Sequence, residues 1–154
     1  MEIKSFKRDS QTIETGMWVD EIPGMKDLRL KVRGLSTPEV ASARARKEMA
    51  EPRDSRNKSG QLKTDIAMRL FGEVLAEVVL LDWDNVTENG KPLKYDLETA
   101  KKWCTEPDFM PFADAVTWAA GRVDQHVDDA SETLVGNSNG SSSGKSNTDP
   151  DTDA

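Results

Sequence analysis

The chain has 154 residues, of which 36% are hydrophobic and 32% charged, as suits one soluble domain with a modest core. Its longest apolar run, Val78-Val79-Leu80-Leu81, is far shorter than the roughly 20 residues that cross a bilayer, so we expect no membrane partner. Cys104 is the single cysteine, which excludes an intramolecular disulfide and is typical of a reducing cytosol.

The net charge of -7 is unevenly distributed along the chain. Residues 26–63 hold eleven Lys and Arg against five acids, whereas residues 106–154 hold ten acids against Arg122 and Lys145. This asymmetry argues against a protein whose whole surface binds nucleic acid. It leaves open a local basic patch, or docking between the two halves.

The N-terminal part predicts a small β-hairpin. Residues 1–15 contain few apolar anchors, and we expect them to be weakly ordered or to form one edge strand. Over residues 16–34, a Pro-Gly turn at 23–24 separates Met17-Trp18-Val19 from a run at 28–33 that alternates apolar and basic side chains. Alternation with period two is typical of a half-buried strand, so the two runs should pair.

Two helices are predicted next. Ser36-Thr37-Pro38-Glu39 has the residue types of a helix N-terminus, and the helix should cover about 37–50 and end before Pro52. From Asp65 onward, apolar residues recur at helical spacing, which predicts a long central helix over 65–82. Trp83 would then lie about one turn beyond Val79 and plug the end of the core.

The remaining signals predict a turn, two helices and a tail. Asn89-Gly90 is a strong turn dipeptide, Asp96 can cap a helix over 96–105, and Pro111 opens an amphipathic helix over 111–134. Residues 135–154 are an acidic, Ser/Gly-rich stretch that we expect to be disordered. The expected fold is therefore mainly α: one domain over 16–134, with a small N-terminal β-hairpin followed by a bundle of about four helices.

No group of residues predicts catalysis, a cofactor or a metal. His126 is the sole histidine and has no second nitrogen or sulfur ligand near it in the sequence. Cys104 lacks a neighbouring base that would activate it. Segment 82–88 departs from a calcium loop, because Thr87 stands where the loop requires glycine. We therefore expect a protein that is not an enzyme.

The order of these signals resembles a known family. It consists of a strand ending in Lys31-Val32-Arg33-Gly34-Leu35, a long helix running into Leu81-Asp82-Trp83-Asp84-Asn85-Val86, and a Gly90-Lys91-Pro92-Leu93 turn. Over roughly residues 15–130 the chain looks like the small tail assembly chaperones of long-tailed bacteriophages. The resemblance implies a protein that binds the tape measure protein and helps recruit tail tube subunits. It also implies a location in the host cytoplasm and absence from the mature virion.

The candidate partner-binding surface is the concentration of aromatic residues around the last two predicted helices. This concentration exceeds what a short helix pair needs, and large aromatics often anchor interfaces. The candidates are Trp103, Phe109, Phe112 and Trp118.

Two other functions stay open at this point. One is a structural tail terminator or connector subunit of the virion. The other is a small DNA-binding regulator that uses the basic region 29–58. We do not expect nucleic acid as the partner, because no aromatic residue is interleaved with the basic residues and no DNA-binding motif accompanies them.

Overall fold

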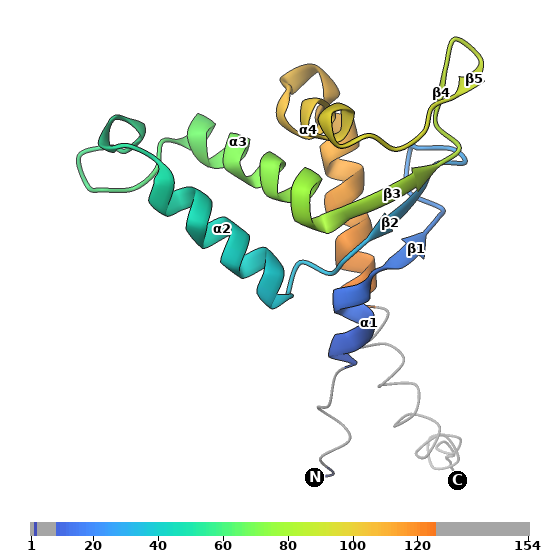
Figure 1. Cartoon of the computed structure of the whole chain (residues 1–154), viewed down its shortest axis with the longest axis horizontal. Coiled ribbons are helices and arrows are strands. Elements are labelled where there is room, and N and C mark those ends of the chain that lie inside the picture. The colour runs from blue at the N-terminus through green and yellow to red at the C-terminus, as the bar shows by residue number, and fades with distance from the viewer. Residues whose placement is uncertain (1, 3–8, 126–154) are drawn as a thin grey trace, which may run out of the picture.

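The computed structural model describes residue 2 and residues 9–125 of the chain. Figure 1 shows α2 and α3 as an arm that projects from a small sheet, with the C-terminal helix passing behind the sheet. The expected tail over 135–154 lies outside the described residues, as do residues 126–134 of the last predicted helix. The helices are α1 (Ser10–Thr15), α2 (Pro38–Ala50), α3 (Thr64–Val74), α4 (Leu97–Thr105) and the C-terminal helix over 110–125, with 3₁₀ turns at Arg53–Ser55 and Pro107–Phe109.

The predicted hairpin is confirmed, and it is part of a larger sheet. Strands β1 (Met17–Val19), β2 (Arg29–Val32) and β3 (Leu80–Asp84) form an antiparallel sheet in the order β1-β2-β3. A separate two-stranded ribbon joins β4 (Thr87–Glu88) to β5 (Lys91–Pro92). Asn89 and Gly90 make its turn with φ values of 52° and 78°, as the dipeptide predicts.

The helix termini follow the local sequence signals. Thr37 caps α2 by accepting a hydrogen bond from the Val40 amide at 3.3 Å, and Pro38 occupies the first helical turn. Asp96 caps α4 by accepting from the Thr99 amide at 2.9 Å. The N-terminal segment is more ordered than expected within the described part, because residues 10–15 form α1 and bury Ile13 to 3% exposure.

The expected helix over 65–82 is wrong at its C-terminal end. Helix α3 ends at Val74, a π-helical turn (η3, Leu75–Val79) follows, and the chain then becomes strand β3. Leu30 on β2 is fully buried opposite Trp83, which fixes the two strands in register. Without β3, one edge of the buried strand β2 would leave backbone N–H and C=O groups without partners. Pairing along this edge therefore outweighs the helical periodicity of residues 80–84.

Arg33 closes the junction between η3 and the sheet. Its backbone amide donates to the Val79 carbonyl at 2.9 Å, and its guanidinium donates to the Val78 carbonyl at 2.9 Å and to the Glu14 carbonyl at 2.6 Å. The last carbonyls of a helix have no partner within the helix. Arg33 therefore supplies the donors that the end of η3 lacks, and it ties α1 to the same point.

A network of charges holds the three middle helices together. Lys47 of α2 lies 3.0 Å from a carboxylate oxygen of Glu77, and Lys101 of α4 lies 3.2 Å from the other. Burial acts to raise the pKa of Glu77, but its hydrogen bonds and charge interactions with the two lysines hold that pKa below the ordinary value of 4.5. Glu77 thus joins α2 and α4 through the turn that follows α3.

We predict that Arg33→Ala lowers the free energy of unfolding by about 1–3 kcal/mol, because the Val78 and Glu14 carbonyls lose their charged donor. Urea denaturation followed by circular dichroism measures the change. Lys31→Ala, on the strand β2 that Arg33 follows, is the matched control and should change stability by no more than about 0.5 kcal/mol. Equal effects of the two substitutions would contradict this account of the junction.

We also predict that Glu77→Gln reduces the pH dependence of stability. Because the pKa of Glu77 is lower in the folded state, its contribution is fully present above about pH 4.5 and is lost as the pH falls through the folded value. The stability difference between the native protein and Glu77→Gln should therefore be largest near neutral pH and shrink in acid, as measured by urea denaturation at each pH. Glu88→Gln, on the exposed ribbon, is the matched control and should change the free energy of unfolding by no more than about 0.5 kcal/mol.

Candidate partner-binding site

Trp83 fills the end of the core, as the sequence predicts. It is 5% exposed, and its indole Nε1 donates to the Leu93 carbonyl at 2.8 Å. Its ring stacks on Trp103 at 5.1 Å and meets Tyr95 edge-on at the same distance. Such contacts add to the burial of the rings. The turn after β3 is thereby anchored to α4.

The structure brings three of the four candidate aromatics together. Trp103 meets Phe112 edge-on at 5.1 Å and stacks on Phe109 at 6.0 Å. All three rings are half-buried, and both Trp103 and Phe112 pack against the core. Trp103 and Phe112 therefore contribute to the packing of the fold, whereas Phe109 is at the edge of this aromatic surface.

Trp118 lies at a different hollow. It is 37% exposed on the C-terminal helix and lines a depression together with Trp18 of the edge strand β1, which is 39% exposed. The guanidinium of Arg122 lies 5.9 Å from the centre of its ring. The four candidate residues are thus divided between two surfaces, since the amphipathic helix that carries Phe112 and Trp118 presents them to different neighbours.

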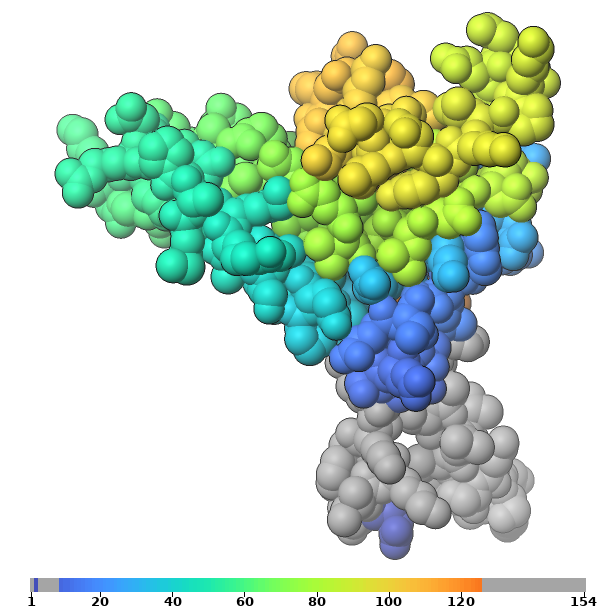
Figure 2. All heavy atoms as spheres, in the orientation of Figure 1, coloured from blue at the N-terminus to red at the C-terminus, as the bar shows by residue number. Residues whose placement is uncertain are grey.

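An apolar groove that was not predicted lies between α3 and the C-terminal helix. It has a volume of about 330 Å³, and the end of α4 closes one side of it. Met68 and Met110 stand at the groove and are 53% and 38% exposed. In Figure 2 the surface is concave where α3, in green, meets the orange atoms that follow α4. Met68 is a large apolar residue that lies outside the apolar stripe of α3. This position in the sequence is the signal that could have indicated an exposed contact residue.

The floor of the groove is formed by a close helix contact. Gly72 of α3 lies against the Cys104 carbonyl of α4, so that a side chain at this position would collide with backbone. Burial raises the pKa of the Cys104 thiol from 9.0 to about 12, which keeps the thiol protonated. The floor is therefore an uncharged surface suited to apolar contact.

Metal-ligating side chains do not gather into a metal-binding group among the described residues. No group of three or more His, Cys, Asp or Glu side chains that could hold a metal ion occurs among them, and His126 lies outside the described part. Glu73 and Glu77, one helical turn apart, are both within ion-pair distance of Lys47. These carboxylates consequently have a structural role.

Much of the basic region 29–58 is engaged within the molecule. Arg29 pairs with Asp84 at 3.6 Å and Arg44 with Glu48 at 3.2 Å. The Arg56 guanidinium donates to the Glu48 carbonyl at 2.6 Å. Cations that are already paired with carboxylates or carbonyls have less to gain from a phosphate. These three arginines therefore have partners within the molecule.

No helix in the described part of the chain is both long and apolar enough to cross a membrane. This finding concerns the helices α1 to α4 and the C-terminal helix as far as residue 125.

Comparison with known proteins relates the chain to a prophage family. No curated protein and no solved structure matches it. A family model described as YdaY prophage protein matches residues 35–137, which is more than half of the chain. The matched range extends from the loop before α2 through the C-terminal helix, so it includes both the groove and the aromatic cluster. The chain belongs to the YdaY prophage protein family and is of phage origin.

Proposed function

We propose that this protein is a phage tail assembly chaperone that binds the tape measure protein and helps recruit tail tube subunits during tail morphogenesis. It acts in the host cytoplasm, without catalysis, and is absent from the mature virion. The phage origin of the family supports this proposal, as does the order of sequence signals from the Val32-Arg33-Gly34-Leu35 strand end to the Gly90-Lys91-Pro92-Leu93 turn.

The observation that carries the proposal is the apolar groove beside α3. A tape measure protein is long, helical and prone to aggregate, so its chaperone must cover apolar helix faces. Amphipathic helices bind by laying their apolar face into a groove. Met68 and Met110 provide flexible, polarisable side chains that adapt to different helix surfaces. Two methionines exposed at one concave surface are therefore suited to a partner with many related helical segments.

The aromatic cluster contributes less directly in this proposal. Trp103 supports Trp83 in the core, so Trp103→Ala would weaken the fold and leave any loss of binding ambiguous. Phe109 is the better probe of the aromatic face, because it lies at its edge, close to Met110 in the sequence. Trp118 would belong to a second contact, on the side of β1.

We predict that the double substitution Met68→Glu and Met110→Glu abolishes co-purification of the full chain with the tape measure protein of the same prophage. Two charges placed on an apolar contact surface cost several kcal/mol of binding free energy, while both positions are exposed enough to leave the fold intact. The measurement is affinity purification after co-expression, with thermal denaturation to verify folding.

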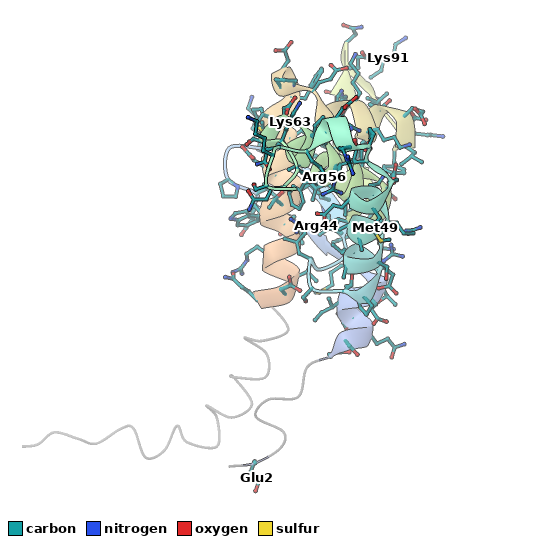
Figure 3. The ribbon with its side chains drawn as sticks, turned by 90° about the vertical axis from the view of Figure 1, so that its left-hand side faces the viewer. Glu2, Arg44, Met49, Arg56, Lys63 and Lys91 are labelled. Atoms are coloured by element: carbon teal, nitrogen blue, oxygen red, sulfur yellow. The ribbon has the colours of Figure 1, made fainter. Side chains whose placement is uncertain are left out.

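Met49→Glu is the matched control for this experiment. Met49 is 83% exposed on α2, and Figure 3 shows it on the opposite side of the arm from the C-terminal helix. This variant should retain the partner. Retention of the partner by the double groove variant as well would exclude the groove. Recovery of the protein from purified phage particles would instead favour a structural tail subunit.

A further inference from the structure

We propose that the groove selects amphipathic helices whose apolar face is flanked by Lys or Arg. This inference rests on the proposed function and adds the chemical class of the bound segment. It is drawn from the charges around the groove, where carboxylates outnumber cations.

Three carboxylates stand around the groove on three different elements. They are Asp65 in the first turn of α3, Glu106 directly after α4, and Asp114 on the C-terminal helix. All three are exposed, and none forms an ion pair with another residue of the described part. Their charges are therefore available to a bound partner.

The cation that lines the groove already forms ion pairs within the molecule. Arg69 is the one Lys or Arg among the residues that line it, within the range that the structure describes. Its guanidinium lies 2.7 Å from a Glu51 oxygen and 3.2 Å from a Glu73 oxygen. With Arg69 neutralised by its own neighbours, the rim presents net negative charge around an apolar floor.

The size of the groove suits a helix with anchor residues one turn apart. A cavity of roughly 150 Å³ holds one benzene, so about 330 Å³ has room for roughly two large side chains. Residues i and i+4 of a helix lie on the same face, about 6 Å apart. Basic residues beside those anchors would reach the rim carboxylates, whereas acidic ones would be repelled by them.

The test uses two labelled helical peptides with the same Leu-rich apolar face, one flanked by Lys and the other by Glu. We expect the full chain to bind the Lys-flanked peptide about tenfold more tightly at low salt, since exposed ion pairs are individually weak and three act together. Fluorescence anisotropy measures both affinities. The preference should decrease with added salt, as the charges become screened.

Charge-neutral variants test whether the rim carboxylates cause the preference for the Lys-flanked peptide. The triple variant Asp65→Asn, Glu106→Gln and Asp114→Asn should lose the preference and keep binding through the apolar floor. The matched control neutralises three exposed carboxylates elsewhere, Glu39→Gln, Glu88→Gln and Glu98→Gln, and should keep it. A preference that survives in the triple variant would overturn the assignment to these residues.

The outcomes separate this inference from the proposed function. Equal affinity for both peptides, with loss of both in the Met68→Glu and Met110→Glu variant, would refute the charge selection and leave the chaperone proposal standing. Failure to bind either peptide would also refute the inference. If the tape measure protein does not co-purify with the native chain either, the proposed function fails as well.

Discussion

The change from helix to strand after α3 is the constraint on which the rest of the molecule depends. At η3 the chain leaves its helix with carbonyls that no longer have partners within it, and Leu75, Ala76 and Val79 of this turn are buried. Arg33 meets this need with its backbone amide and its guanidinium. Because the same residue follows β2 directly, the hydrogen bonds that close the turn lie next to the pairing of β2 with β3.

This junction decides which surfaces face the core and which stay open. With β3 paired to β2, Trp83 lies at the end of the core. Trp103 of α4 stacks on it, so α4 packs against this end of the sheet. Gly72 then allows α4 to approach α3 closely, and Glu77 holds α4 and α2 from the other side. The groove is what remains between α3 and the C-terminal helix when these contacts have been made.

The division of large side chains between core and surface gives the chaperone proposal its physical basis. The stacked aromatics are mainly used for the stability of the domain, as their mutual contacts and their packing on the core indicate. The flexible Met68 and Met110 are left at the open groove. A rigid aromatic surface would favour one partner geometry, whereas methionines permit several, which is an advantage for a protein that must follow a long helical chain.

Local features were predicted well from the sequence, and non-local ones were not. The Thr37 and Asp96 caps and the Asn89-Gly90 turn depend on residues within a few positions of one another, and the structure has each of them. Of the candidate aromatics, Trp103, Phe109 and Phe112 come together in the structure and Trp118 lies elsewhere, and their binding of a partner stays a prediction. The exposed Met68 and Met110 were not among the candidates. Neighbouring positions on a helix can face different elements, and periodicity does not reveal which.

The sequence by itself determined the mainly helical character, the hairpin and the caps. The tertiary structure decided that the apolar run ending in Leu80 and Leu81 turns from helix into strand, and that a groove with an acidic rim is left open beside α3. The physical reason is that a short apolar run fits either state equally well. The strand is favoured over the helix here because β2, which is distant in the sequence, pairs with the backbone of residues 80–84. Arg33, directly after β2, donates hydrogen bonds to the carbonyls at the end of η3.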